Sequence, residues 1–196
     1  MENIDILSRL REIISMSRVE KTYYRGREYL YLFNPITSGV SPIDPSHLSL
    51  IADLIRRKID GIGDFDYILT YEAMGIHIAT LIAERLGKPF IIARKKRYTP
   101  DMIEIKRRRE NLYIPKDVTE SKIIIVDSII STGETIVNTF KALISHGVEV
   151  KGIYSFINRI DQGGSRNIYI ETGIKPYSII EVIVKPGGVE VSNINL

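Results

Sequence analysis

Cysteine is absent from this chain of 196 residues, which excludes a disulfide framework and a thiolate metal site. The three histidines, His47, His77 and His146, are scattered without the spacing of a zinc site. No apolar run approaches the roughly 18 residues that a membrane-spanning helix needs. The first residues also lack a basic segment followed by an apolar one. We therefore expect a cytoplasmic protein without a structural zinc ion.

A strong excess of charge is lacking as well. The formal net charge is +3 and the pI is about 9.0, a balance that does not by itself indicate a nucleic-acid partner and is equally compatible with a small polyanionic substrate. Hydrophobic residues make up 44% of the chain and charged residues 26%, which is typical of a globular protein. The length is enough for one domain with a substantial core, so we predict a single domain over residues 1–196.

Short apolar runs alternate with amphipathic helical segments along most of the chain. The runs expected to be strands are 28–33, 67–71, 90–93, 122–126, 152–157 and 178–184, with a short hairpin at 187–191. The segments expected to be helices are 4–19, 45–61, 76–86 and 135–146. Continuous β-branched runs between helices are typical of parallel strands that are buried on both faces. We predict an α/β fold with a doubly wound, mostly parallel sheet.

Residues 95–115 break this alternation. The basic residues gather here, as Arg94-Lys95-Lys96-Arg97 and Lys106-Arg107-Arg108-Arg109. The stretch is too polar for a core element and long for an ordinary connection, so we expect a mobile loop. The second basic cluster is as often a solvated face as a binding site.

The stretch 123–135 joins a buried strand to a helix through a loop of small residues. Free N–H groups of such a loop and of the first helical turn converge on one point, which suits a phosphate. The hydroxyls of Ser131, Thr132 and Thr135 add donors, and Asp127 can accept hydrogen bonds from sugar hydroxyls. The loop has neither the Gly-Lys-Ser/Thr ending of a Walker A motif nor three spaced glycines, which disfavours a nucleoside triphosphatase or a dehydrogenase.

This stretch, Ile123 to Thr135, resembles the phosphoribosyl pyrophosphate motif of type I phosphoribosyltransferases, in which two acids follow an apolar strand. Ser128 stands where that family has its second acid. Glu72-Ala73-Met74-Gly75 is similar to the pyrophosphate loop of the purine enzymes, and Arg94-Lys95 follows the next strand as in that family. Asn34-Pro35 is similar to the archaeal-type purine enzymes in particular.

The resemblance implies roles for individual residues. Those expected to bind phosphate and ribose are Asp127, Ser128, Ser131, Thr132, Gly133, Glu134 and Thr135. Those expected to bind pyrophosphate are Glu72, Ala73, Met74, Gly75, Arg94 and Lys95. Asp127 and Glu104 are the expected catalytic residues, and Phe33 and Ile129 the expected base contacts. Phe33 also has a plain structural interpretation, because an aromatic residue in a strand is more often part of the core.

The implied activity is transfer of ribose 5-phosphate from phosphoribosyl pyrophosphate to a purine nitrogen, with release of pyrophosphate, as in purine salvage. The implied cofactor is Mg²⁺, held mainly by substrate and water with no direct protein ligand. A homodimer is also implied, with the loop 95–115 closing over the site and a hood built from 1–45 and 158–196. Which purine is used stays open. The alternative is a regulator that binds phosphoribosyl pyrophosphate or a nucleotide with little or no activity, motivated by Ser128 and the basic surface.

Overall fold

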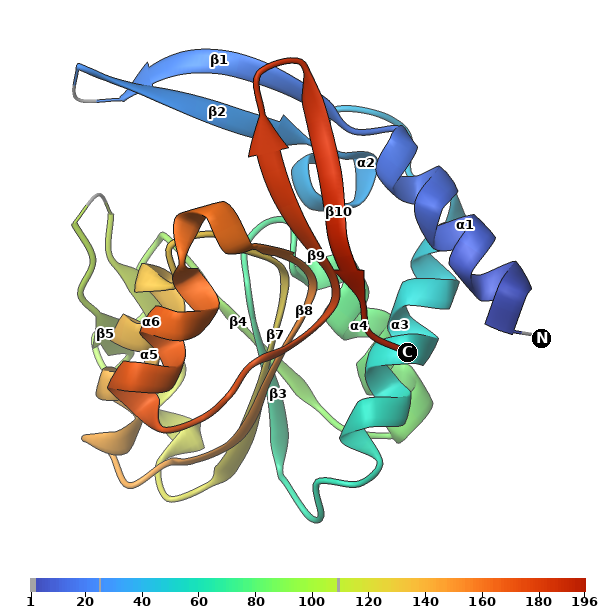
Figure 1. Ribbon diagram of the computed structural model, residues 1–196. Helices are drawn as coiled ribbons and strands as arrows, with labels where there is room; N and C mark the ends of the chain where they lie inside the picture. The colour runs from blue at the N-terminus through green and yellow to red at the C-terminus, as the bar shows by residue number, and fades with distance from the viewer. Residues whose placement is uncertain (1–2, 25, 109) are drawn as a thin grey trace.

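The computed structural model describes residues 3–24, 26–108 and 110–196 (Figure 1). The helices are α1 (Asn3–Ser15), α2 (Pro35–Ser38), α3 (Pro45–Ile59), α4 (Ile76–Leu86), α5 (Glu134–Ile144) and α6 (Gly164–Thr172), with 3-10 turns η1 (Lys116–Val118) and η2 (Ile160–Gln162). The strands are β1 (Arg18–Tyr24), β2 (Arg27–Phe33), β3 (Tyr67–Tyr71), β4 (Phe90–Ala93), β5 (Ile103–Ile105), β6 (Leu112–Ile114), β7 (Lys122–Ile130), β8 (Glu149–Arg159), β9 (Tyr177–Lys185) and β10 (Gly188–Ile194). No helix in this described part of the chain is both long and apolar enough to span a bilayer.

The centre of the molecule is a six-stranded sheet in the order β10-β9-β8-β7-β3-β4. All neighbours are parallel except β10, which is antiparallel to β9. Helices α3 and α4 cover one face and α5 and α6 the other (Figure 1). Strand β7 contributes side chains to the hydrophobic cores on both faces of the sheet. Ile124 and Val126 pack in the core under α3 and α4, while Ile123 and Ile125 pack in the core under α5. The predicted doubly wound α/β fold is confirmed.

The N-terminal segment forms a helix followed by a two-stranded ribbon. Helix α1 ends at Ser15, and the prediction that it continues to Val19 is wrong, because residues 18–24 form β1 and pair antiparallel with β2. Valine, threonine and tyrosine in this segment favour an extended strand. Figure 1 shows the β1–β2 ribbon above the ends of β7 and β8.

Residues 103–114 contain a small hairpin, β5–β6, that is part of the core. Its inward side chains, Ile103, Ile105, Leu112 and Ile114, are at most 4% exposed. They pack in the same cluster as α5 and β4 residues. The expectation that this stretch holds no core element is therefore wrong. The alternating apolar residues of the two strands were overlooked because each strand is short and the basic residues at the tip of the hairpin separate them.

Residues 158–196 contribute to both the body and the top of the molecule. Helix α6, which the sequence pattern did not predict, packs on α5. Strand β9 extends the main sheet beside β8, and β9 and β10 contact β2 and β1 of the ribbon. The N-terminal ribbon and the C-terminal strands therefore meet above the sheet (Figure 1).

Candidate active site

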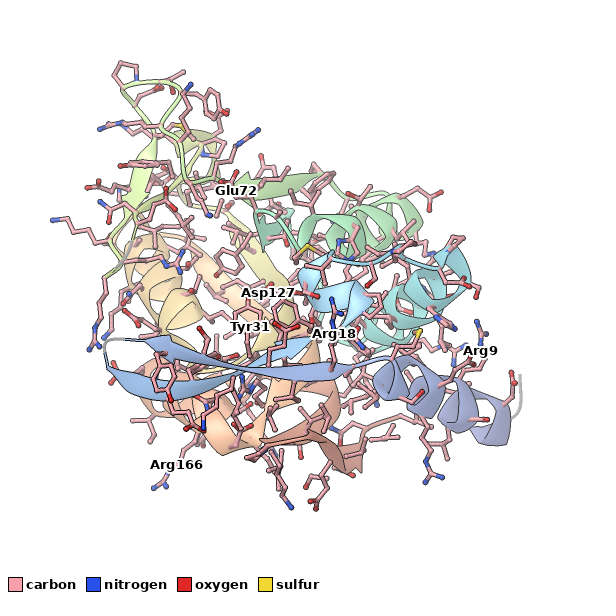
Figure 2. The ribbon with its side chains drawn as sticks, turned by 90° about the horizontal axis from the view of Figure 1, so that it is seen from above. Arg9, Arg18, Tyr31, Glu72, Asp127 and Arg166 are labelled. Carbon is pink, nitrogen blue, oxygen red and sulfur yellow. The ribbon has the colours of Figure 1, made fainter. Side chains whose placement is uncertain are left out.

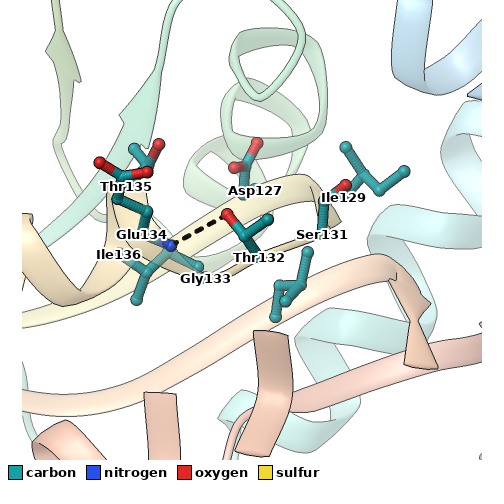
Figure 3. Close-up of a pocket in the computed structure, with 9 residues that line it drawn as sticks. Asp127, Ile129, Ser131, Thr132, Gly133, Glu134, Thr135 and Ile136 are labelled. Atoms are coloured by element: carbon teal, nitrogen blue, oxygen red, sulfur yellow. Dashed lines mark hydrogen bonds between the residues drawn. The ribbon is translucent and has the colours of Figure 1, made fainter. Parts of the chain in front are cut away.

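A pocket of about 200 Å³ lies where β7 ends and α5 begins (Figure 3). It is lined by Asp127, Ile129, Ile130, Ser131, Thr132, Gly133, Glu134, Thr135 and Ile136. Gly133 has φ 74°, a left-handed conformation that glycine adopts without a steric cost, and this turns the chain into the helix. The first turn of α5 is therefore presented to the pocket, with N–H groups that the helix itself does not use. The geometry suits a phosphate.

Asp127 supplies one of the two carboxylates that line this pocket, and Glu134 supplies the other. Burial raises the pKa of Asp127 to about 7, while a hydrogen bond from the Ser128 N–H (2.7 Å to Oδ1) and the nearby positive charge of Arg107 act in the opposite direction. The carboxyl still lines the pocket, so it can accept hydrogen bonds from a ligand there. Near neutral pH it is poised between its two protonation states.

Helix α6 packs directly against residues 131–133, which form the phosphate loop between β7 and α5. A Cβ on Gly164 would lie 2.0 Å from the carbonyl oxygen of Ser131, and one on Gly133 would lie 2.7 Å from the carbonyl oxygen of Gly164. The side chain of Asn167 donates to the carbonyl oxygen of Thr132 at 3.1 Å. Sequence reasoning missed this support. The adjacent glycines 163 and 164 were its only local signal, and they lie about 30 residues further along the chain.

A second loop, Glu72 to Gly75, joins β3 to α4 beside the first. Strand β3 pairs in parallel with β7, so the two loops leave the same edge of the sheet. Gly75 is needed because a Cβ there would lie 2.2 Å from the hydroxyl oxygen of Thr70. The peptide bond between Glu72 and Ala73 is cis. Asp127 and Glu72 are labelled in Figure 2, which views this edge from above.

Glu72 organises the basic segment that follows β4. One carboxylate oxygen accepts the backbone N–H of Lys95 at 2.9 Å, and the other lies 3.5 Å from Nε of Arg94. The Arg94 guanidinium also lies 4.8 Å from the ring centre of Tyr98, and Nζ of Lys95 lies 3.6 Å from Glu110. Three of the six residues expected to bind pyrophosphate are therefore joined by direct contacts.

A wider hollow adjoins the phosphate loop on its outer side. It measures about 640 Å³ and is lined by Lys106, Arg107, Arg108, Thr132, Glu134, Val137, Asn138, Lys141, Asn167 and Glu171. Nε of Arg108 lies 3.5 Å from Glu134, which also lines the phosphate pocket. The basic tip of the β5–β6 hairpin thus lies beside the phosphate loop. Arg109, the last residue of the predicted basic cluster, lies outside the described residues.

The chain matches the model of the phosphoribosyl transferase domain over residues 44–192. The chain belongs to the phosphoribosyltransferase family. This match confirms that the motifs resemble those of type I phosphoribosyltransferases. The matched range contains both loops and the basic segment between them.

Alignments with similar phosphoribosyltransferases cover nearly the whole chain. A hypoxanthine/guanine phosphoribosyltransferase of Methanothermus fervidus is 33% identical over 96% of this chain and 98% of its own length. One of Methanosarcina acetivorans is 36% identical, with 96% and 98% covered. Among solved structures, an adenine phosphoribosyltransferase of Thermoanaerobacter pseudethanolicus aligns with a TM-score of 0.71 at 24% identity, covering 88% of this chain and 99% of that one. This last likeness shows the fold.

Of the residues expected to bind phosphate and ribose, to contact the base or to act in catalysis, three do not line the phosphate pocket. Ser128 is 1% exposed and its side chain is enclosed by protein. Glu104, on β5, accepts hydrogen bonds from the Asn111 side chain (2.8 Å) and the Tyr113 hydroxyl (3.2 Å) and lines neither hollow. Phe33 lies on the ribbon, with its ring centre 4.7 Å from that of Tyr31.

Helix α2 ties the ribbon segment of this phosphoribosyltransferase to the loop from Glu72 to Gly75. A Cβ on Gly39, at the end of α2, would lie 2.9 Å from the sulfur of Met74. Nε2 of His77 lies 3.0 Å from the carbonyl oxygen of Ile36, and burial lowers the pKa of His77. His77 is therefore a packing residue between α4 and α2.

Proposed function

We propose that this protein is a purine phosphoribosyltransferase that transfers ribose 5-phosphate from phosphoribosyl pyrophosphate to hypoxanthine or guanine. The observation that carries the proposal is the pocket at the start of α5, where backbone N–H groups of the first helical turn and the carboxylate of Asp127 meet. A ligand with both a phosphate and sugar hydroxyls satisfies both kinds of group. The names of the similar archaeal enzymes support the choice of base.

Each loop has a part in the proposed reaction. The 5-phosphate binds to the residues between Ser131 and Thr135, and Asp127 accepts hydrogen bonds from the ribose hydroxyls. The pyrophosphate group binds to the loop 72–75, with Arg94 and Lys95 neutralising part of its charge. The purine nitrogen attacks the anomeric carbon as pyrophosphate leaves, so the protein mainly positions the reactants and stabilises the departing charge.

Mg²⁺ is part of this proposal as an ion carried by the substrate. In the described part of the chain, no three histidine, aspartate or glutamate side chains are grouped so that they could hold a metal ion. The pyrophosphate and water would supply the oxygen ligands that Mg²⁺ prefers. When bound, the ion would offset the charge of the leaving group. We also propose a homodimer acting in the cytoplasm.

The test is pyrophosphate release with phosphoribosyl pyrophosphate, Mg²⁺ and one base at a time: hypoxanthine, guanine, xanthine, adenine or orotate. We expect turnover with hypoxanthine or guanine and little with orotate. An Asp127→Ala variant serves as the matched inactive control. Tight binding of phosphoribosyl pyrophosphate without turnover on any base would instead favour a regulator.

A further inference from the structure

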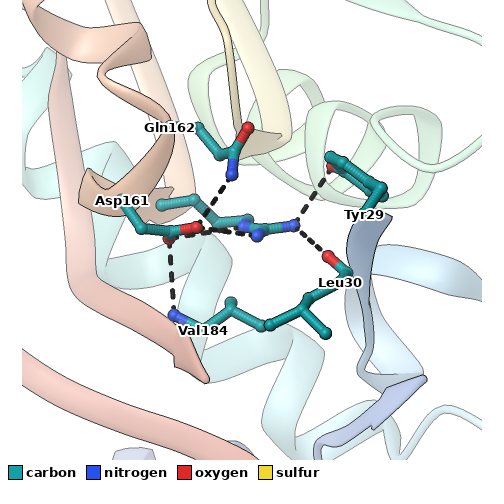
Figure 4. Close-up of polar contacts among 6 residues, drawn as sticks. Tyr29, Leu30, Asp161, Gln162 and Val184 are labelled. Carbon is teal, nitrogen blue, oxygen red and sulfur yellow. Dashed lines mark hydrogen bonds and ion pairs between the residues drawn. The ribbon is translucent and has the colours of Figure 1, made fainter. Parts of the chain in front are cut away.

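Arg159, the last residue of β8, is buried although it carries a full charge. Figure 4 shows its contact partners, Tyr29 and Leu30 on one side and Asp161 on the other. Its side chain is only 2% exposed. Nη1 donates to the carbonyl oxygen of Leu30 at 2.8 Å and to the hydroxyl of Tyr29 at 3.1 Å, both on the ribbon strand β2. Nη2 donates to Oδ2 of Asp161 at 2.8 Å. One guanidinium thus joins the end of the main sheet to the ribbon.

Asp161 extends this connection to a third strand. Its side chain is 18% exposed, accepts a hydrogen bond from Gln162 at 2.9 Å and lies 3.4 Å from the backbone N–H of Val184 on β9. Burial alone would raise the pKa of Asp161, but hydrogen bonds from Arg159 and Gln162 and the charge of Arg159 lower it overall. The carboxylate is therefore ionised at neutral pH, and removing Arg159 would leave this charge without its cationic partner.

The strand that Arg159 holds carries the aromatic face of the ribbon. Tyr31 and Phe33 are two and four residues after Tyr29, so all three side chains share one face of β2. The ring centres of Tyr29 and Tyr31 are 6.2 Å apart. A two-stranded ribbon is marginally stable alone, so its position depends on such attachments. From above, the ribbon crosses the molecule and Tyr31 lies beside Asp127 in projection (Figure 2).

We infer that Arg159 and Asp161 are positioning residues for the purine base, because together they fix the ribbon strand β2 relative to the end of β7. The inference rests on the proposed function. Of the two proposed base contacts, Phe33 belongs to the ribbon and Ile129 to the sheet, so the ribbon's attachment sets the space between them. The phosphate pocket contains neither Arg159 nor Asp161, so donor binding does not depend on this attachment.

The test is a split between two Michaelis constants in Arg159→Gln. We expect the KM for the base to rise about tenfold or more while the KM for phosphoribosyl pyrophosphate stays within about twofold. Arg159→Lys keeps the charge but loses the forked geometry, so its KM for the base should lie between those of the wild type and Arg159→Gln. Tyr29→Phe removes one hydroxyl and should raise the KM for the base about threefold. The matched control is Arg166→Gln, since Arg166 is an exposed arginine at the edge of the molecule (Figure 2).

A parallel rise of both Michaelis constants, or an unchanged KM for the base in both Arg159→Gln and Tyr29→Phe, would overturn the inference. Hydrogen exchange gives a second readout that does not need turnover. In Arg159→Gln the amides of β1 and β2 should exchange faster while those of β7 and α5 keep their wild-type rates. If the wild type shows no turnover, the proposed function fails but this measurement still decides the attachment. Unchanged exchange in β1 and β2 would show that Arg159 does not hold the ribbon in place.

Discussion

The phosphate pocket and the ribbon above it differ in where their residues lie along the chain. The pocket is lined by residues of one short stretch, 127 and 129–136, and its key groups are backbone N–H groups that a strand, a loop and a helix place together. The ribbon depends on contacts between residues far apart in the chain, such as Arg159 with Tyr29 and Leu30. The proposed donor and base subsites should therefore be separable by mutation, with the phosphate loop governing the donor and the ribbon attachment governing the base.

The largest effect is expected where α6 touches the phosphate loop. In Gly164→Ala, the new Cβ would meet the carbonyl oxygen of Ser131, so the loop or the helix must move. We expect kcat/KM for phosphoribosyl pyrophosphate to fall about 100-fold, because small displacements of positioning groups carry costs of that size. The free energy of unfolding should fall by about 1–3 kcal/mol. Gly61→Ala is the control, because a Cβ at Gly61 meets nothing within 4 Å. Equal kinetics for both variants would show that the α6 contact does not shape the loop.

Asp127→Asn keeps the shape of the side chain and removes its charge. A hydrogen bond to a charged group contributes about 1.5–3 kcal/mol, so kcat/KM for phosphoribosyl pyrophosphate should fall about 10- to 100-fold. Initial rates at saturating base measure this. The KM for the base should stay close to the wild-type value, because Asp127 belongs to the pocket and not to the ribbon. A selective rise in the KM for the base would break the proposed separation.

The pH dependence of donor use should follow the ionisation of Asp127. Because burial raises the pKa of Asp127 to about 7, the carboxylate form is lost as the pH falls through that value. Donor binding needs the carboxylate as an acceptor, so kcat/KM for phosphoribosyl pyrophosphate should decline by up to about tenfold per pH unit below pH 7. Phosphate groups of the substrate titrate in the same range, so the Asp127→Asn profile is the reference. Superimposable profiles would contradict this role for Asp127.

The smallest effect is expected at Ser128. Its side chain is enclosed by protein and does not line the pocket. Ser128→Ala should therefore change kcat/KM by about threefold or less, with a loss of about 1 kcal/mol in the free energy of unfolding. Steady-state kinetics and urea unfolding measure the two quantities. A loss comparable with that of Asp127→Asn would contradict a purely structural role for the Ser128 side chain.

The contiguous parts of the structure could be predicted from the sequence, and the long-range parts could not. The pattern of 122–136 predicted the strand, the loop and the helix, because each depends on neighbouring residues. The packing of Gly164 on Ser131 and the pairing of Arg159 with Asp161 and Tyr29 depend on how α6 and the ribbon fold back. Spacing along the chain carries no signal for such contacts.

Local patterns also misled where two signals overlapped. The basic tip at Lys106 to Arg108 concealed the period-two pattern of β5 and β6. The apolar spacing of α1 ran into the first residues of β1, so the helix was predicted to continue to Val19. In both cases pairing with a partner strand decided the structure. The sequence placed Glu104 near the reaction by position alone, and its role there stays a prediction.

The measurement that tests the central claim most directly is the conversion of labelled hypoxanthine and guanine to their nucleotides in the presence of phosphoribosyl pyrophosphate and Mg²⁺. We predict nucleotide and pyrophosphate in equal amounts with the wild type, and about 10- to 100-fold slower formation with Asp127→Asn at low donor concentration. Tight donor binding with no nucleotide formed from any purine would contradict the account.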